Sequence, residues 1–575
     1  MANNTEPAAT ALDTRFEQLA ARYVDEVTAF SPVGATHLGD HRHDAVLDQV
    51  SPEARRGKAA FCRAVLDDLA AIPRRQLSRA NQIDAAMLEH RLQSEIWHIE
   101  ELREWSWNPM AYTALAGNAV YGLVARDFAP LAQRLANAAA RMEQIPRMLA
   151  QGRAAIDIPR ATKIHTETAV KQNPGVTSLI ENMIRPHVAS LAQAQRRRMQ
   201  QAIAVARQAV EDHQKWLEGK VLPNAAGDWR IGAELFDRKL SFALSSKLTR
   251  AEIRKLAEDH LLRVRREMYD LAAEVYRREH PHTRHPAKPS KAYRQAIIRA
   301  CLEMACRQTP DITRIVQIAQ AQLDRLTEFV RSAGIVTVQP DPVKVIEMPE
   351  FRRGQTLAYC DSPGPLDVGQ GSFYAIAPPP ADWSAEQVRS LLREYNTRSL
   401  ENLTVHEAMP GHYLQITHSS RYPSTLRAML SSGTFVEGWA VYTEGMMVER
   451  GAYGDDALMK LVVLKWLLRA IANAILDQAA HVDGMSREQA MELMIEDTFQ
   501  EEREAAGKWT RAQQSSAQLS TYFVGYLEHV ALRREMESKL GDKFNLKAYH
   551  DQLLSYGSPP MRHVRALMLD LPIES

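Results

Sequence analysis

Residues 403–415 read Leu-Thr-Val-His-Glu-Ala-Met-Pro-Gly-His-Tyr-Leu-Gln, which is close to a zinc-protease motif. In the usual H-E-x-x-H motif, two histidines four positions apart on one helix bind the metal, and the glutamate is the general base. His406, Glu407 and His412 supply the same residue types, but here the histidines are six positions apart. On a regular helix, six positions rotate the second histidine about 240° from the first. Either the motif is a coincidence or the helix is distorted between the histidines.

Two residues between the histidines favour a distorted helix. Pro410 has no N–H, and its ring clashes with the carbonyl group four residues earlier, which is that of His406. Gly411 tolerates unusual backbone angles. The sequence therefore predicts an irregular backbone at residues 409–411 that brings His412 round to His406.

A catalytic zinc site needs a third protein ligand and one position left for water. Residues 434–444 (TFVEGWAVYTE) place Glu437 and Glu444 seven positions apart, on one face of a predicted helix. Their neighbours are mostly apolar, and a carboxylate on a buried face needs a partner such as a metal. Taken alone, Glu437 is more often an ordinary ion-paired residue. If His406 and His412 form a real site, Glu437 becomes the favoured third ligand.

Two further groups downstream are weaker candidates. Asp477 and His481 lie four positions apart on a predicted helix. They form either a local side-chain pair, which the residues alone favour, or an arrangement in which Asp477 orients His481 toward a substrate carbonyl or a zinc-bound water. Tyr522 and Tyr526 are of a type that donates hydrogen bonds to an oxyanion beside zinc, although each alone is more often a core residue.

Most of the chain is predicted to be helical, because apolar residues recur at three- and four-residue spacing. The clearest helical segments are 13–29, 54–69, 80–102, 130–150, 188–217, 250–277 and 292–306. The segment 280–290 contains three prolines and three histidines and is predicted to be a loop. We expect a helical region covering the cleft (1–333) and a catalytic zinc region (334–575), with one intertwined unit as the alternative.

A small sheet is predicted just before the helix of His406. Alternating or β-branched segments occur at 335–339, 343–348, 356–360 and 372–377, separated by Pro, Gly and Asp. An extended substrate could add to the edge of such a sheet through main-chain hydrogen bonds. A purely structural hairpin is equally consistent with these residues.

Composition excludes several kinds of partner. The 575 residues include 71 Lys and Arg against 70 Asp and Glu, so the net charge of +1 gives no electrostatic case for nucleic acid or an anionic membrane. The four cysteines form no C-x-x-C pair, and no run of about 18 apolar residues occurs. Residues 1–10 lack a basic segment followed by an apolar one, so we expect a cytoplasmic protein.

Taken together, these motifs resemble those of the DUF885 family of predicted zinc hydrolases. The family's H-E-G-x-P-G-H-H-x-Q-like motif is matched by residues 406–415, its F-x-E-G-W-A-x-Y-x-E motif by 435–444, and its V-V-D-x-G-x-H-like stretch by 475–481. Its P-G-Q-A-x-x-Y-x-x-G, F-H-D-x-x-L-x-x-G-x-x-P and A-T-x-L-G-D-H-x-x-D stretches resemble 516–525, 549–560 and 35–44. The resemblance spans nearly the whole chain and implies a mainly α, large multi-helix zinc-peptidase-like fold with a small β-sheet beside the active-site helix.

The resemblance also implies roles for individual residues. One Zn²⁺ ion would be bound by His406, His412 and Glu437, with Glu407 as general base. The oxyanion would be stabilised by Tyr522, with His481 as a second candidate. The strand 371–377 would hold the substrate backbone. The remaining implied residues are Gly371, Ser372, Phe373, Tyr374 and Tyr526 for substrate binding, and Asp477, Glu444 and Gln415 as supports.

Two comparisons with other zinc peptidases refine these roles, and four departures qualify them. The 435–444 motif is similar to the F-V-E-x-P-S-Q segment of thimet-oligopeptidase-like peptidases, whose glutamate is the third ligand, so it selects Glu437 over Glu444. Dipeptidyl peptidase III offers a parallel for a lengthened histidine spacing. The chain departs from the family pattern at Ala408, Tyr413, 516–517 and Tyr526, so we expect its substrate preference to differ.

The expected function is that of a zinc-dependent hydrolase that cleaves an amide bond in a short peptide or peptide-like substrate. One alternative is an amidase acting on a non-peptide small molecule in a biosynthetic or detoxification pathway. A second is a helical binding protein without catalysis. No nucleic-acid or membrane partner is expected, and a homodimer is left open.

Overall fold

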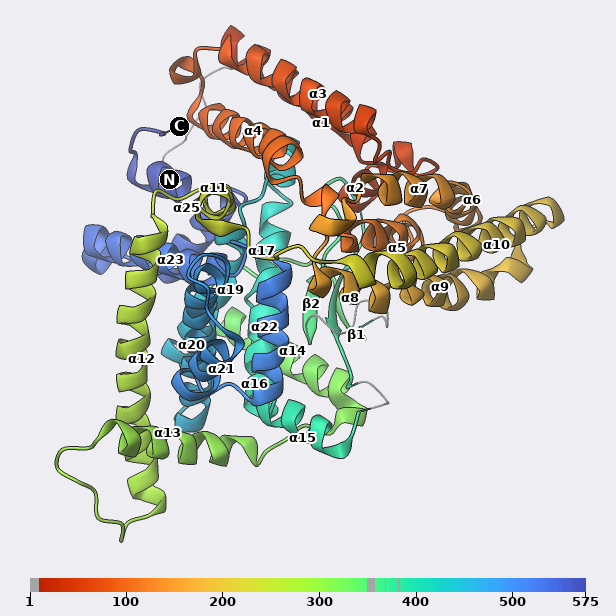
Figure 1. Ribbon diagram of the computed structural model, residues 1–575. Helices are drawn as coiled ribbons and strands as arrows, with labels where there is room; N and C mark the ends of the chain where they lie inside the picture. The colour runs from red at the N-terminus through yellow and green to blue at the C-terminus, as the bar shows by residue number, and fades with distance from the viewer. Residues whose placement is uncertain (1–9, 349–356, 368, 380–382, 575) are drawn as a thin grey trace.

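The computed structural model describes residues 10–348, 357–367, 369–379 and 383–574. As predicted, the fold is mainly α-helical with one small sheet (Figure 1). Among the described helices, none combines the length and the apolar character needed to cross a lipid bilayer.

The first part of the chain forms helices that lie together at the top and right of Figure 1. They are α1 (Ala11–Val27), α2 (Pro32–Leu38), α3 (Pro52–Ala70), α4 (Arg79–Trp97), α5 (Met110–Val124), α6 (Leu131–Met142), α7 (Ile145–Ala155), α8 (Lys163–Gln172), α9 (Pro174–Leu179) and α10 (Gln193–Trp216). The predicted single helix at 130–150 is two helices, because Pro146 stands at the second position of α7 and cannot continue α6.

The middle of the chain supplies four helices, the sheet and α15. These elements are α11 (Gly232–Leu244), α12 (Arg250–Glu279), α13 (Lys291–Cys306), α14 (Ile315–Ser332), β1 (Val343–Glu347), β2 (Ala358–Asp361), β3 (Ser372–Ile376) and α15 (Ala385–Glu394). The sheet order is β1-β3-β2, with β3 parallel to β1 and antiparallel to β2. Strand β2 packs against α16, so the sheet lies beside the His406 helix as predicted.

The C-terminal part is again helical. Its helices are α16 (Thr397–Glu407), α17 (His412–Ser419), α18 (Thr425–Met429), α19 (Gly433–Glu449), α20 (Ala457–His481), α21 (Arg487–Glu492), α22 (Glu502–Gln514), α23 (Ser520–Leu540), α24 (Leu546–Ser555) and α25 (Met561–Leu569). Asn396 begins α16 by accepting hydrogen bonds from the first free N–H groups of that helix.

The predicted strand at 335–339 is wrong. Ile335 and Val336 are buried, but this segment forms no strand pairing; it is held by the C-terminal helix α24. Thr337 donates its N–H and its hydroxyl to the carboxylate of Asp551, and the Ile335 carbonyl contacts His550 Nδ1 at 2.9 Å. Ile335 and Val336 therefore pack into the hydrophobic core without forming part of a sheet. Of the predicted strand 356–360, residue 356 lies outside the described residues.

The hydrophobic cores cross the boundary predicted at residue 333. One core joins residues of α11–α13 to residues of α20–α23, and another joins α14 and the sheet to α16, α17, α19 and α23–α25. In contrast, helices between residues 33 and 221 form a core that contains no residue from the later part of the chain. The helices between 232 and 332 thus share their hydrophobic cores with the part of the molecule that carries His406.

Candidate metal centre

The helix that carries the motif is broken at the predicted place. Helix α16 ends at Glu407 and α17 begins at His412. In the break, the Gly411 N–H donates to the Val405 carbonyl, six residues earlier, at 2.9 Å. A Cβ atom on Gly411 would lie 1.9 Å from the His406 carbonyl oxygen, so only glycine fits. Trp439 Nε1 donates to the Pro410 carbonyl at 2.8 Å and fixes the break against α19.

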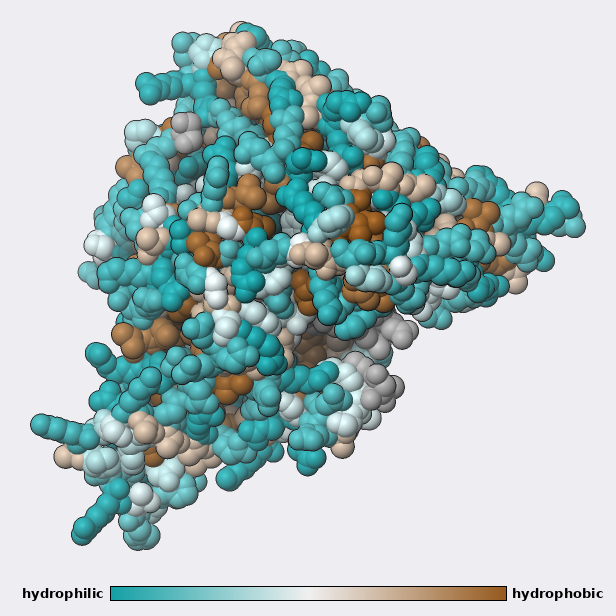
Figure 2. All heavy atoms as spheres, in the orientation of Figure 1, coloured by the Kyte–Doolittle hydropathy of each residue, from teal (hydrophilic) through white to brown (hydrophobic). Residues whose placement is uncertain are grey.

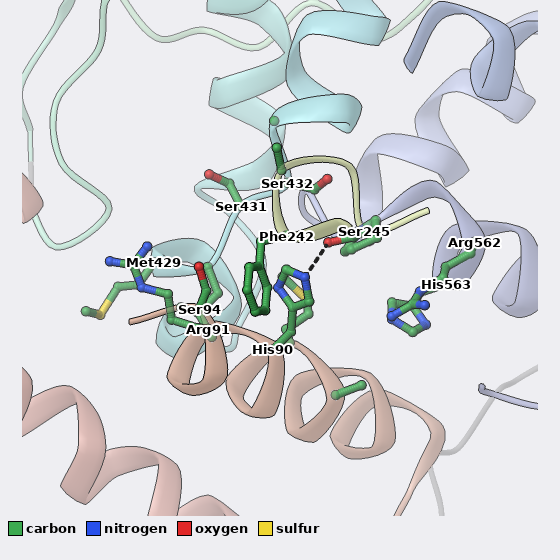
Figure 3. Close-up of a pocket in the computed structure, with 16 residues that line it drawn as sticks. His90, Arg91, Ser94, Phe242, Ser245, Met429, Ser431, Ser432, Arg562 and His563 are labelled. Atoms are coloured by element: carbon green, nitrogen blue, oxygen red, sulfur yellow. Dashed lines mark hydrogen bonds between the residues drawn. The ribbon is translucent and has the colours of Figure 1, made fainter. Parts of the chain in front are cut away.

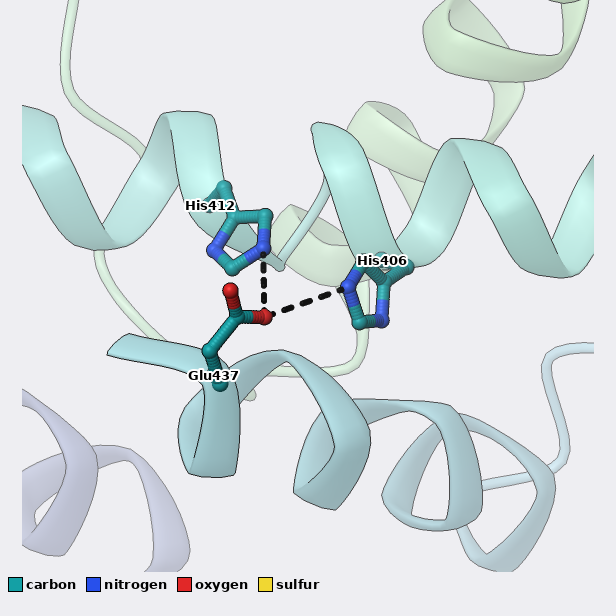
Figure 4. Close-up of side chains that lie close together, drawn as sticks. All are labelled: His406, His412 and Glu437. Carbon is teal, nitrogen blue, oxygen red and sulfur yellow. Dashed lines mark ion pairs between the residues drawn. The ribbon is translucent and has the colours of Figure 1, made fainter. Parts of the chain in front are cut away.

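The break brings three candidate ligands together (Figure 4). The Nε2 atoms of His406 and His412 lie 3.9 and 3.5 Å from Glu437 Oε2, and the candidate ligand atoms of the three residues are all within 4.8 Å of one another. The two imidazole rings are nearly perpendicular, with centroids 4.8 Å apart. Among the described residues, this is the one cluster of at least three such side chains with this spacing.

Glu444 orients His406 by contacting the ring nitrogen that does not face Glu437. Its Oε1 lies 2.7 Å from His406 Nδ1, and its Oε2 accepts a hydrogen bond from Asn402 Nδ2 at 2.9 Å. A carboxylate can only accept, so Nδ1 carries the hydrogen of this bond. The lone pair of neutral His406 is then on Nε2, the atom that faces Glu437. This carboxylate–histidine pairing is typical of metal sites.

The electrostatics of the cluster fit a bound cation. Burial lowers the pKa of His406, but the hydrogen bond to Glu444 and the charges of Glu444, Glu407 and Glu437 raise it to about 9. Burial raises the pKa of Glu437, but His412 and His406 outweigh that effect and lower it. The cluster thus attracts positive charge, and two imidazole nitrogens with one carboxylate oxygen form a donor set common in catalytic zinc sites.

Glu407 lies beside this cluster on the side of the sheet. It is the last residue of α16 and only 8% exposed. Its charge acts on Cys360 in β2 and Tyr374 in β3, where it adds to the burial that raises the pKa of each group. The charge of Glu407 also contributes to raising the pKa of His406, so the carboxylate influences both the sheet and the first metal-ligand candidate.

Tyr522 lies on the other side, near Glu437. Burial and the charge of Glu437 raise its pKa, and its hydroxyl accepts a hydrogen bond from Arg511 Nη2 at 3.2 Å. Tyr526 lies one helical turn further along α23, where burial raises its pKa and a hydrogen bond with Arg263 of α12 opposes the rise. The structure thus brings Tyr522, rather than Tyr526, close to a metal-ligand candidate.

Asp477 and His481 have other partners. His481 Nε2 lies 2.8 Å from the Ala512 carbonyl and 2.9 Å from that of Ser515, and its ring packs on Phe236. Asp477 accepts hydrogen bonds from Ala517 N and from both donors of Ser520, at the start of α23. These contacts give both residues a role in holding α22 and α23, the helices of Arg511 and Tyr522, in place.

The strand predicted to hold substrate is the middle strand of the sheet. Because β3 pairs with β1 on one side and with β2 on the other, its main chain is not an edge, contrary to the prediction. The side chains have partners in the fold as well. Gly371 O accepts from Arg126, Ser372 Oγ contacts Ser362, Arg126 lies 4.9 Å from the Phe373 ring, and the Tyr374 hydroxyl lies 3.3 Å from Thr404 Oγ1.

Gln415 supports α17 rather than the ligands. Its Nε2 donates to Ser419 Oγ and to Ser558 Oγ, each at 2.6 Å, which ties α17 to the segment before α25.

A cavity of about 160 Å³ lies at the start of α19, near α4 and α11 (Figure 3). Its lining includes His90, Phe242, Ser432, Arg562 and His563 and none of the site residues predicted from the sequence. This cavity is therefore separate from the metal-ligand cluster.

The sequence alone did not indicate a charged group next to the cluster. It consists of Glu504, Lys508 and Arg511 on α22 and Arg469 on α20, with the Trp466 ring of α20 packed against Arg469. Their spacing of four and three residues indicates that Glu504, Lys508 and Arg511 lie on one face of a helix. The sequence does not show that this face points into the molecule, because that depends on tertiary packing.

Comparison with known proteins identifies the family of this chain. The family described as "Bacterial protein of unknown function (DUF885)" matches residues 32–568. The chain belongs to the DUF885 family. None of the curated proteins compared with it matches.

Two solved structures resemble this DUF885 chain over nearly its whole length. One, described as "a putative lipoprotein of unknown function" from Shewanella oneidensis, is 35% identical, with a TM-score of 0.81, covering 96% of this chain and 99% of that one. The other, "the putative lipoprotein from Colwellia psychrerythraea", is 18% identical, with a TM-score of 0.79 and coverage of 98% and 99%, and shows the fold alone. Cytoplasmic location of this chain stays a prediction.

Proposed function

We propose that this DUF885 protein is a zinc-dependent hydrolase that cleaves an amide bond in a short peptide or peptide-like substrate. The observation that carries the proposal is the convergence of His406, His412 and Glu437 on one point, with Glu444 behind the first histidine. An ordinary structural ion pair would not need two imidazole Nε2 atoms aimed at one carboxylate oxygen.

The residues present fit zinc, which would be held by the two Nε2 atoms and the Glu437 carboxylate. Bound there, zinc would supply Lewis-acid chemistry, polarising the substrate carbonyl and making water more acidic. The two histidines are 8% and 9% exposed, and Glu407 is 8% exposed. Such burial favours short substrates, because a folded protein could not bring its backbone to these atoms.

The neighbouring residues provide the proton transfers and orientation. Glu407 accepts a proton from the attacking water and returns it to the nitrogen of the leaving amine. Tyr522 donates its hydroxyl hydrogen to the substrate oxygen as negative charge develops there, while Arg511 holds the hydroxyl in position. Glu444 keeps His406 in the tautomer whose Nε2 is free to bind the metal.

The test is metal analysis of the purified protein, followed by hydrolysis of a pool of short peptides. We expect one zinc per chain, loss of zinc in His406→Ala, and retained zinc with hydrolysis lowered at least about 100-fold in Glu407→Gln. Matched controls are His282→Ala and Glu502→Gln, which change exposed residues of the same types. Stoichiometric zinc in His406→Ala would refute the ligand assignment, and undiminished hydrolysis by Glu407→Gln would refute the role of the base.

A further inference from the structure

One face of α22 carries a line of charged residues toward the inside of the molecule. Glu504, Lys508 and Arg511 are spaced by four and three positions, so they lie on the same side of the helix. Helix α22 packs against α20 and α15, and the charged face meets Lys465 and Arg469 of α20 there.

The carboxylates of this cluster are already paired. Glu504 Oε1 accepts from Arg469 Nη2 at 2.6 Å, and its Oε2 accepts from the Tyr395 hydroxyl at 3.2 Å. Glu394 Oε2, at the end of α15, accepts from Lys465 Nζ at 2.7 Å. Each of the two carboxylates therefore already has a cationic partner: Arg469 for Glu504, and Lys465 for Glu394.

The other two cations of this charged group, Lys508 and Arg511, form no ion pair with a carboxylate of the described residues. Lys508 is only 9% exposed, and among the described residues no carboxylate oxygen lies within 4.0 Å of its Nζ. Arg511 donates to Gln518 Oε1 at 2.9 Å and to the Tyr522 hydroxyl at 3.2 Å, both neutral acceptors. Burying unpaired positive charge is unfavourable, so this arrangement indicates that an anion completes the cluster.

The cluster is adjacent to the metal ligands at two points. Arg511 shares Tyr522 with the surroundings of Glu437, whose charge acts on both residues. Arg469 lies 4.7 Å from the Trp466 ring, and the Trp466 ring lies 6.5 Å from that of His406. A molecule whose anionic end is bound between Lys508 and Arg511 would therefore have its adjoining groups near the metal-ligand candidates.

We propose that Lys508 and Arg511 bind the free carboxylate of the substrate, so that the enzyme removes residues from the C-terminal end of short peptides or N-acyl amino acids. The proposal rests on the proposed hydrolase function and names its substrate class. The planar guanidinium of Arg511 can donate two parallel hydrogen bonds to a carboxylate, and Lys508 adds a point charge. A terminal carboxylate suits this site because it carries the negative charge that the two cations lack, whereas an internal peptide group carries none.

The protonation of Lys508 is consistent with this assignment. Burial and the positive charges of Arg469 and Arg511 lower its pKa to about 7, against the opposing charges of Glu504 and Glu394. A bound carboxylate would add a negative charge beside it and raise that pKa again. Substrate binding near pH 7 would then take up a proton, whereas binding of an uncharged amide would not.

The first experiment compares a pool of N-acetyl tripeptides synthesised as C-terminal acids with the same pool synthesised as C-terminal amides. Cleavage is followed by mass spectrometry for the wild type, Lys508→Met and Arg511→Lys. We expect the wild type to prefer acids by about 100-fold, and Lys508→Met to reduce that ratio by at least about tenfold, the value of one charge-assisted hydrogen bond. Lys539→Met, which removes an exposed cation from α23, should leave the ratio unchanged.

The second experiment does not depend on hydrolysis. Calorimetry measures binding of N-acetyl-trialanine, as acid and as amide, to zinc-loaded Glu407→Gln protein with and without Lys508→Met. We expect the acid to bind at least about tenfold more tightly, with proton uptake detected in buffers of different ionisation enthalpy, and both effects to disappear in Lys508→Met.

The outcomes separate this proposal from the hydrolase proposal. Equal binding of acid and amide by the Glu407→Gln protein would overturn the carboxylate site, even if the wild type cleaves peptides. An equal loss of acid and amide cleavage in Lys508→Met would overturn it as well, because that is what a structural role would produce. A carboxylate preference in binding without any peptide cleavage would support the site and count against the hydrolase.

Discussion

His406 Nδ1 lies 2.7 Å from Glu444 Oε1, so the first metal-ligand candidate is held by a carboxylate from the helix that also carries the third. Glu437 and Glu444 are seven residues apart on α19. The Glu437 carboxylate faces Nε2 of His406, and the Glu444 carboxylate faces Nδ1. One rigid helix therefore sets both the position and the tautomer of this histidine.

The Glu444–His406 contact predicts an effect on zinc affinity. Glu444→Gln should weaken zinc binding about 10- to 100-fold, because the amide orients the imidazole less firmly and does not increase its basicity. Competition with a chromophoric chelator measures the affinity. Glu449→Gln, at the exposed end of the same helix, is the control, and equal affinities of the two variants would contradict a role for Glu444 in the site.

Zinc binding should stabilise the folded protein. Free zinc at about 1,000 times its dissociation constant should add about 4 kcal/mol to the free energy of unfolding, because the folded state binds the metal and the unfolded chain does so much less. Calorimetric melting with and without a chelator shows the shift in Tm. The His412→Ala variant should show no shift, and a shift equal to that of the wild type would place the zinc elsewhere.

Close contact between α19 and α23 predicts a second effect on stability. A Cβ atom on Gly438 would lie 2.3 Å from the Gly525 carbonyl carbon. Gly438→Ala should therefore force the helices apart and lower the free energy of unfolding by at least about 2 kcal/mol. Gly445→Ala, on the same helix with nothing within 4 Å of the added Cβ, should instead stabilise the fold by about 0.5–1 kcal/mol. Urea unfolding of both variants checks the contrast, and similar effects would contradict the close packing.

The pH dependence of stability should include a contribution from His41. Burial lowers its pKa, but hydrogen bonds with Asp367 and Asp44 raise it to about 9. A raised folded pKa means that this contribution is fully present below about pH 6.5 and is lost as the pH rises through 9. His41→Gln should thus cost about 2 kcal/mol at pH 6 and almost nothing at pH 10. Urea unfolding at the two pH values measures this difference, with the exposed His187→Gln as control; an equal cost at both would exclude the ionic contribution.

The metal-ligand cluster could be predicted from sequence because its cause is local. Pro410 and Gly411 lie between the two histidines, and their backbone properties alone explain why the helix must break there. Glu437 and Glu444 share the same apolar surroundings, and only the resemblance to other zinc peptidases selected Glu437 as the third ligand. The effect of Pro410 and Gly411 on the backbone is confined to a few residues, so it can be predicted without knowledge of the fold.

Other features depend on contacts between distant segments and could not be predicted in the same way. The segment at 335–339 has the composition of a strand, but Asp551 and His550 hold it in place of a neighbouring strand. The position of β3 in the middle of the sheet is set by strand order, which local pattern does not determine. Likewise, local sequence does not show that Arg469 and Lys465 of α20, rather than Lys508, form the ion pairs with Glu504 and Glu394.

The cores that extend across residue 333 have a consequence for how this chain can be divided and inherited. A fragment that starts at the sheet would lose α11–α14 and expose the apolar surfaces that these helices cover. Such a fragment should aggregate on expression rather than act as a minimal enzyme. By the same reasoning, evolution could not easily transplant the motif-bearing half into another protein by gene fusion, and the unit of exchange would be nearly the full-length chain.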